Sequence, residues 1–186
     1  MDLTDRHVVV LVTGISAAGK STVSELLARR FDRGVHVRGD VFRRMVVAGR
    51  AEMTPDAGPE ALRQLQLRYT LGAATADAYF AAGFSVVVQD VVIGSGLADY
   101  VAMITSRPLC VVCLAPSRAA VAAREASRAK VAYEGGKHGL DALDEAWRVA
   151  TPRLGLWLDT SDQTPEQTVD EIVARAWRDA RVEEVG

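Results

Sequence analysis

Cysteine and lysine are scarce in this sequence, and long hydrophobic runs are absent. Of the 186 residues, two are cysteines and three are lysines. No uncharged apolar stretch reaches the roughly 18 residues that a membrane-spanning helix needs. The first apolar run, Val8–Val12, is shorter than the core of a signal peptide and follows acidic residues instead of a basic leader. These absences argue against membrane insertion and export, so we expect a cytoplasmic protein.

The two cysteines, Cys110 and Cys113, have the C-x-x-C spacing of redox and metal-binding pairs. They lie within Leu109–Leu114, an apolar run that is typical of a buried strand. Residues three apart in a strand point to opposite faces, so we expect two buried, reduced thiols and no shared site. The histidines, which also lack a paired metal-ligand spacing, are His7, His36 and His138.

No charge of one sign dominates the chain. It carries 22 basic and 24 acidic residues, which gives a formal net charge of -2. No global positive field therefore attracts a nucleic-acid backbone or an anionic membrane, and any anion site must be built locally. The length suits one compact domain, and we expect residues 1–186 to form it.

Short segments rich in valine, isoleucine and leucine alternate with longer helical or polar segments, which predicts a parallel sheet with crossover helices. The predicted strands are Val8–Thr13, Val35–Arg38, Phe84–Asp90, Leu109–Leu114 and Leu154–Leu158. Apolar residues at helical spacing predict helices over Gly19–Phe31 and Ala61–Ala82. Ser117 and Thr164 are candidate N-caps of two further helices. The predicted fold class is α/β, with a five-stranded parallel sheet between two helical layers.

Residues 14–21, Gly-Ile-Ser-Ala-Ala-Gly-Lys-Ser, match G-x-x-x-x-G-K-[ST] in full, between a predicted strand and a predicted helix. This is the context of a P-loop, whose backbone amides and helix N-terminus surround the phosphates of a nucleotide. Lys20 can reach the β- and γ-phosphates, and the Ser21 hydroxyl can bind Mg²⁺. A glycine turn with a purely structural role would not explain why one of only three lysines lies at this position. The expected ATP-binding residues of the loop are Gly14, Ser16, Ala17, Ala18, Gly19, Lys20, Ser21 and Thr22.

Two aspartates follow predicted strands, at the edge where ligands bind in an open parallel sheet. Asp40 could accept a hydrogen bond or a proton from an attacking hydroxyl, and its alternative role is the N-cap of the following helix. Asp90 has the position of a Walker B acid, which holds Mg²⁺ directly or through water, and its alternative role is a turn residue. Which of the two acts as the base stays open.

Basic and polar side chains flank these positions. Arg43 or Arg44 could pair with an anionic part of the substrate. We expect residues 41–82 to form a substrate-binding helical region, in which Gln64, Arg68 and Tyr69 are further candidate lining residues. An exposed helix face is the alternative for all of them.

Arg124 and Arg128 are four residues apart and therefore share one face of a predicted helix. A glycine-rich segment, residues 134–139, follows them. This arrangement predicts a lid over residues 117–150 that closes on a transferring phosphoryl group and shields it from water. The alternative is again an exposed, charge-balanced helix face.

With these motifs in place, the sequence resembles the P-loop small-molecule kinases, in particular the group of chloramphenicol phosphotransferase, adenylylsulfate kinase and gluconate kinase. The resemblance covers nearly the whole chain and rests on residues 14–21, 39–40, 90–94, 124–128, 158–161 and 164–172. It implies a fold like that of the nucleoside monophosphate kinases, with a helical lid.

The resemblance also implies roles for individual residues. Asp40 matches the acid beside the acceptor hydroxyl. Arg124 and Arg128 match lid arginines, and Thr160 and Ser161 match residues that line the adenine pocket. The guanine-specifying motif N-K-x-D is absent, which favours ATP as the donor. The segment after Asp40 varies with substrate across this group and identifies none.

We therefore expect an enzyme, a kinase that uses ATP and Mg²⁺ to phosphorylate a hydroxyl of a small molecule, either an antibiotic or a metabolite. The expected catalytic residues are Lys20, Asp40, Arg124 and Arg128, and the expected magnesium ligands are Ser21 and Asp90. A nucleotide or polynucleotide kinase remains an alternative, as does an ATP-binding switch or ATPase without kinase activity.

Overall fold

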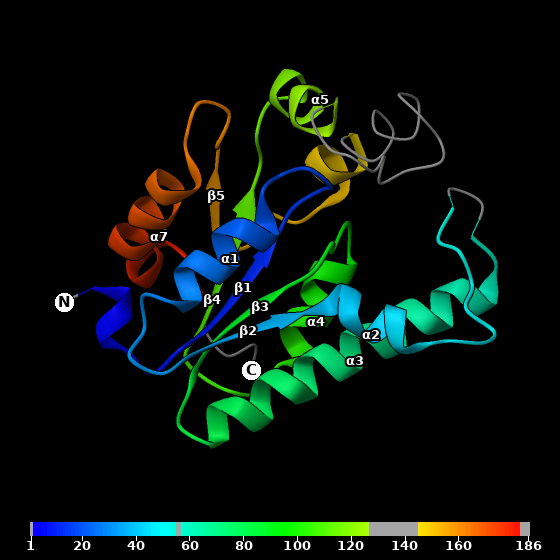
Figure 1. Ribbon diagram of the computed structural model, residues 1–186, viewed down its shortest axis with the longest axis horizontal. Helices are drawn as coiled ribbons and strands as arrows, with labels where there is room; N and C mark the ends of the chain where they lie inside the picture. Colours follow the sequence, from blue (N-terminus) through cyan, green and yellow to red (C-terminus); the bar gives the residue numbers. More distant parts are fainter. Residues whose placement is uncertain (1, 55–56, 127–144, 183–186) are drawn as a thin grey trace.

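The computed structural model describes residues 2–54, 57–126 and 145–182, and its centre is a twisted sheet (Figure 1). Five parallel strands lie in the order β2-β3-β1-β4-β5. They are β1 (Val9–Thr13), β2 (Gly34–Arg38), β3 (Ser85–Gln89), β4 (Leu109–Leu114) and β5 (Leu156–Leu158). The predicted five-stranded parallel sheet is confirmed. A short sixth strand, β6 (Arg181–Val182), pairs antiparallel with the start of β4 and was not predicted.

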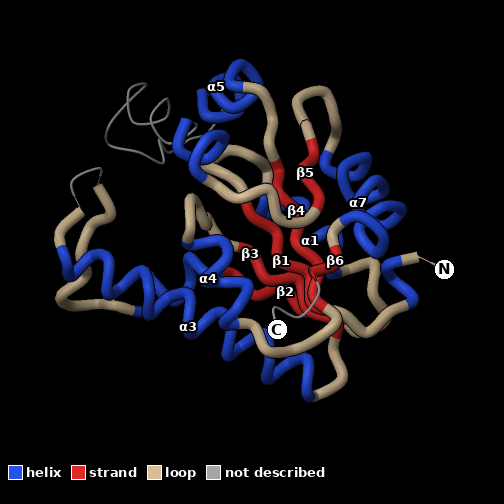
Figure 2. The backbone as a smooth tube through the Cα atoms, turned by 180° about the vertical axis from the view of Figure 1, so that it is seen from behind, coloured by secondary structure: helices blue, strands red, loops and turns tan. Residues whose placement is uncertain are grey.

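Helices cover both faces of the sheet. They are α1 (Lys20–Ala28), α2 (Gly39–Met45), α3 (Pro59–Ala81), α4 (Gly96–Met103), α5 (Arg118–Ala126) and α7 (Pro165–Asp179), with short helical turns η1 (Leu3–Asp5) and η2 (Ala146–Ala150). α1 packs with α7 on one face, and α3 packs with α4 on the other (Figures 1 and 2). The predicted three-layer arrangement is therefore confirmed. Among the described residues, no helix combines the length and apolar character needed to cross a membrane.

The central strands are predominantly apolar because both of their faces are covered. Every residue of β1, β3 and β4 is buried. Cys110 and Cys113 lie in β4 as buried, free thiols, as predicted. Burial raises the pKa of Cys110 to about 11 and that of Cys113 to about 12, so neither sulfur is a reactive thiolate.

Two helix starts follow the predicted capping chemistry. The Thr164 hydroxyl accepts a hydrogen bond from Gln167 N at 3.2 Å, and the Gln167 side chain accepts one from Thr164 N at 2.9 Å. This capping box opens α7. At α5, Ser117 Oγ accepts a hydrogen bond from Ala120 N at 3.2 Å. Both N-caps were predicted from the sequence.

The register of the sheet brings three strand ends together. Gln89, the last residue of β3, pairs with Val12 on one side and with Arg38 on the other. Asp90 therefore lies between the residues that follow β1 and those that follow β2. This places the candidate aspartates and the glycine-rich loop at one edge of the sheet, where parallel α/β folds bind ligands.

Candidate active site

The loop between β1 and α1 has the backbone of a phosphate cradle. Gly14 and Gly19 have φ angles of 149° and 95°, and Ala17 adopts the left-handed region at 58°. A side chain at Gly14 would place its Cβ 2.6 Å from Leu114 O, so the position requires glycine. α1 begins at Lys20. The amides at the start of a helix point along its axis and can bind an anion.

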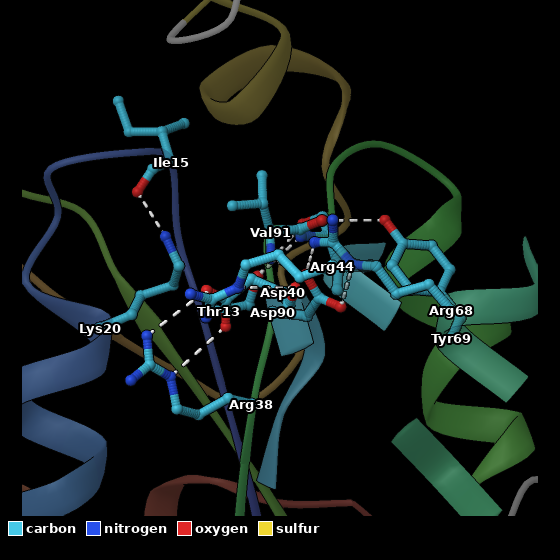
Figure 3. A network of polar contacts seen from close by, with 11 residues as sticks. Thr13, Ile15, Lys20, Arg38, Asp40, Arg44, Arg68, Tyr69, Asp90 and Val91 are labelled. Carbon is cyan, nitrogen blue, oxygen red and sulfur yellow. Dashed lines mark hydrogen bonds and ion pairs between the residues drawn. The ribbon is translucent and has the colours of Figure 1, made fainter. Parts of the chain in front are cut away.

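Lys20 lies folded onto its own loop. Its ammonium donates a hydrogen bond to Ile15 O at 2.7 Å, and the residue is 8% exposed (Figure 3). Ser21 and Thr22, which follow it, are exposed, whereas Ala17 and Ala18 are buried. The loop thus presents a lysine, a hydroxyl and backbone amides, as a nucleotide phosphate requires.

Asp40 is held by two arginines at the end of β2. Arg44 donates to Oδ2 at 2.6 Å, and Arg38 Nη2 lies 3.4 Å from the same oxygen. Oδ1 is buried and accepts no hydrogen bond from the described residues, although Arg38 Nε lies 3.4 Å from it. Asp40 lies within the first turn of α2, which begins at Gly39, so the alternative of an N-cap is wrong.

Asp90 is paired with Arg68, which reaches it from α3. Arg68 Nε donates to Oδ2 at 2.7 Å, and Nη2 forms an ion pair with Oδ1. Oδ1 also accepts a hydrogen bond from Val91 N at 2.6 Å. The Asp90 side chain is only 1% exposed and that of Arg68 is 15% exposed. Burial lowers the pKa of the Arg68 guanidinium from its usual value.

The two expected magnesium ligands differ in how well they suit a metal. Ser21 presents an exposed hydroxyl at the start of α1, which fits a magnesium ion bound mainly through nucleotide phosphates. Both oxygens of Asp90 are already bound by Arg68 and Val91, so this carboxylate does not fit. The described part of the chain holds no cluster of three or more histidine, cysteine, aspartate or glutamate side chains that could hold a metal.

The other candidate substrate residues contact the protein itself. Tyr69 is buried and donates to Val91 O at 2.8 Å, and burial raises its pKa to about 12. Gln64 accepts from Ala51 N at 2.9 Å and donates to Gly49 O at 2.8 Å, so it attaches the segment after α2 to α3. Arg43 forms an ion pair with Glu52 in that same segment.

Arg124 connects the two sides of the expected nucleotide site. Its guanidinium donates to Thr160 O at 2.5 Å and to Ala18 O at 3.5 Å. Thr160 is buried, and the neighbouring Ser161 accepts from Ser117 N at 2.7 Å. Arg124, Thr160 and Ser161 therefore lie beside the P-loop. Arg128 and residues 127–144 of the expected lid lie outside the described residues.

Sequence reasoning did not place Arg38 and Arg44 beside Asp40 as its partners. Arg44 lies four residues after Asp40, and this spacing is a recognisable signal for a contact along one helix face. Arg38 lies in the preceding strand, and its contact depends on where the strand ends and the helix begins. That boundary is not visible in the sequence.

Comparisons with known proteins agree with this arrangement. Residues 9–153 match the family model described as an AAA domain. No curated protein sequence matches the chain. A sugar kinase from Janibacter sp. has a similar structure, with a TM-score of 0.64 and 19% identity, over 88% of this chain and 90% of that chain.

Two further structures resemble the chain. A tunicamycin resistance protein from Deinococcus radiodurans matches with a TM-score of 0.63 and 13% identity, over 96% of this chain and all (100%) of that chain. A gluconokinase from Sinorhizobium meliloti matches with a TM-score of 0.56 and 20% identity, over 88% of each chain. These likenesses show a shared P-loop kinase-like fold, as the sequence predicted.

Proposed function

Because the chain belongs to the AAA domain family that its residues 9–153 match, we propose that it is a kinase that moves the γ-phosphoryl group of ATP to a hydroxyl of a small molecule. The observation that carries this proposal is the position of Asp40. Its carboxylate is fixed by arginines at the same sheet edge as the P-loop, and its side chain is 44% exposed. A hydroxyl can therefore approach this carboxylate, which suits the acceptance of its proton.

The reaction that these residues support is a direct displacement. The acceptor hydroxyl oxygen forms a bond to the γ-phosphorus, the bond from that phosphorus to the bridging oxygen breaks, and ADP leaves. Asp40 orients the hydroxyl and takes its proton. Lys20 and the amides of the loop neutralise charge on the phosphates, and Arg124 holds the nucleotide side of the site.

Magnesium fits this scheme through Ser21. When bound, Mg²⁺ supplies additional neutralisation of phosphate charge, and the Ser21 hydroxyl would hold it together with phosphate oxygens. The residues of the chain itself position the two reactants and exclude water from them. This is sufficient for phosphoryl transfer, because that reaction needs no covalent nucleophile.

Several kinds of acceptor are compatible with the site. The names of the similar structures, a sugar kinase, a gluconokinase and a tunicamycin resistance protein, support a small-molecule acceptor. We expect an antibiotic or a sugar-like metabolite. The purified protein should be incubated with ATP, Mg²⁺ and pools of such compounds, and the products examined by mass spectrometry for an added phosphate. Release of free phosphate alone would contradict the proposal.

Replacing Asp40 with asparagine tests the role of its carboxylate. We expect Asp40→Asn to lower turnover by about 100-fold or more, because general-base catalysis contributes at least this factor. The affinity for ATP should stay within a factor of about two, since the P-loop is unchanged. Asp99→Asn, at an exposed position in α4, is the matched control and should keep full turnover. Equal turnover in both variants would remove Asp40 from the mechanism.

A further inference from the structure

The end of β3 carries a buried carboxylate whose neighbours leave it no free oxygen. Asp90 accepts hydrogen bonds from Arg68 Nε at 2.7 Å and from Val91 N at 2.6 Å, and both of its oxygens pair with the Arg68 guanidinium. A Cβ added at Gly39 would collide with the same carboxylate, so the backbone of α2 closes it from a third side. Asp90 is thus enclosed by α2, α3 and its own strand end.

The polar groups next to Asp90 are also paired. Val91 O accepts from the Tyr69 hydroxyl at 2.8 Å. Val92 N donates to Thr13 Oγ1 at 3.1 Å, and the Thr13 hydroxyl lies 3.3 Å from Val92 O. Magnesium requires near-ideal octahedral coordination and usually keeps several waters. The 1% exposure of the Asp90 side chain leaves no space for such a shell.

A metal at Asp90 would also have to displace Arg68. A guanidinium and a carboxylate joined in this two-pronged way form one of the strongest hydrogen-bonded pairs in proteins. Removing one partner of a buried pair leaves an uncompensated charge, which is strongly destabilising. Arg68 has a side chain that is only 15% exposed, so a displaced guanidinium would need a new partner.

We propose that Asp90 is a positioning residue that fixes Arg68 at the acceptor side of the site, and that it does not bind magnesium. Arg68 comes from α3, which packs against α2, the helix that carries Asp40 (Figure 1). Figure 3 shows the side chains of Arg68 and Asp90 close together. Of the five N–H donors of a guanidinium, those on Nε and Nη2 face Asp90, and the others remain for an oxygen of the acceptor. This inference rests on the proposed kinase function.

The dependence of ATP binding on Mg²⁺ distinguishes a positioning role of Asp90 from a metal-binding role. ATP binding should be measured by calorimetry over a range of Mg²⁺ concentrations for the wild type, Ser21→Ala, Asp90→Asn and Arg68→Gln. The Mg²⁺ midpoint is the Mg²⁺ concentration that gives half-maximal ATP binding. We expect Ser21→Ala to raise this midpoint by about tenfold. Asp90→Asn and Arg68→Gln should shift it by less than about twofold. A rise in Asp90→Asn equal to that in Ser21→Ala would overturn the inference.

A double variant protects this test against misfolding. Arg68→Gln combined with Asp90→Asn removes both charges and leaves two amide groups that can hydrogen bond to each other. It should bind ATP with the wild-type Mg²⁺ midpoint, and a raised midpoint would count against the inference. If the wild type itself binds no ATP, the proposed function fails, and that outcome is distinct from a shifted midpoint in the variants.

The positioning role is tested by phosphoryl transfer to the compound pool at saturating Mg²⁺ and ATP. Arg68→Gln, Asp90→Asn and the double variant should lose the same factor, about 100-fold, because the two residues act as one unit. Arg68→Lys should not restore the rate, since an ammonium cannot replace the planar fork. A pair that only stabilises the fold would lower the melting temperature and leave the rate unchanged, and this result would overturn the inference.

Discussion

Position 39 requires glycine because a side chain there would meet Asp90, and not because of its backbone conformation. It opens α2 in helical conformation, and a Cβ at this position would meet the Asp90 carboxyl group. The glycine therefore allows the strand end and the helix to approach closely. A search for glycines with left-handed backbone would miss it.

Replacing Gly39 with alanine should disturb this contact. We expect Gly39→Ala to lower the free energy of unfolding by about 1–3 kcal/mol, the usual cost of overpacking a filled interior. Gly96→Ala is the matched control, because Gly96 also opens a helix and its Cβ would make only ordinary contacts, 3.8 Å from Val92 and 4.0 Å from Tyr69. The control should change stability by less than about 0.5 kcal/mol. Urea unfolding of both variants measures the difference, and equal effects would show that the contact is unimportant.

The turn between β1 and α1 could be predicted from the sequence because its motif is local. Gly14, Lys20 and Ser21 lie within eight consecutive residues, and the turn between them depends on the backbone freedom of Gly14 and Gly19. The pairing of Arg68 with Asp90 could not be predicted in the same way. The two residues are 22 positions apart and meet only because α3 packs against the end of β3.

At the scale of elements, the segment between α2 and α3 is attached through the Gln64 side chain and through the ion pair between Arg43 and Glu52. The Gln64 amide, in α3, binds Gly49 O and Ala51 N, and it also donates to Glu60 at 2.8 Å. The same segment contains two exposed apolar residues, Val47, which is 96% exposed, and Met53, which is 43% exposed. Apolar packing therefore contributes little to holding this segment in place, and the hydrogen bonds of Gln64 contribute more.

Removing the Gln64 amide should loosen this segment. We expect Gln64→Ala to accelerate hydrogen exchange about tenfold in peptides that cover residues 46–54, since two hydrogen bonds to backbone are lost. Gln66→Ala is the control, because the exposed Gln66 amide contacts the Met103 sulfur, at 4.0 Å, and no residue of the segment that the structure describes between α2 and α3. Exchange in the central strands should not change. Unaltered exchange in residues 46–54 would show that other contacts hold the segment.

The elements that the sequence did not predict are short or begin in an unusual way. α4 follows Gly94 and Ser95 and itself begins with Gly96, a run that indicates a turn more than a helix. β6 has two residues, too few to show any periodicity. By contrast, α3 and the strands with continuous apolar runs were predicted to within about two residues, since burial on one or both faces leaves a clear pattern.

At the scale of the whole molecule, the core makes stability sensitive to alkaline pH. Burial raises the pKa of Cys110 from 9.0 to about 11, that of Cys113 from 9.0 to about 12 and that of Tyr69 from 10.0 to about 12. Each group releases its proton more easily in the unfolded chain. The stabilisation that these protonated groups provide is therefore complete below pH 9. It is lost as the pH rises through their pKa values in the folded protein.

The loss should be about 1.4 kcal/mol per pH unit for each group at most, within this window. We expect the free energy of unfolding, measured in urea, to fall between pH 9 and pH 11. In the double variant Cys110→Ala and Cys113→Ala, the fall should begin nearer pH 10, where only tyrosine contributes. The comparison uses slopes, because the alanines also lower stability at every pH by leaving cavities. Identical slopes would contradict a thiol contribution.

The hydrogen bond from Lys20 to Ile15 O has a consequence for the binding of an anion at the loop. A phosphate that engaged this ammonium would replace a neutral carbonyl partner with an anionic one, so the net gain would be the difference between the two partners. That difference would grow with the charge brought to the loop. The free energy gained at Lys20 is therefore smaller than the full strength of a charged hydrogen bond.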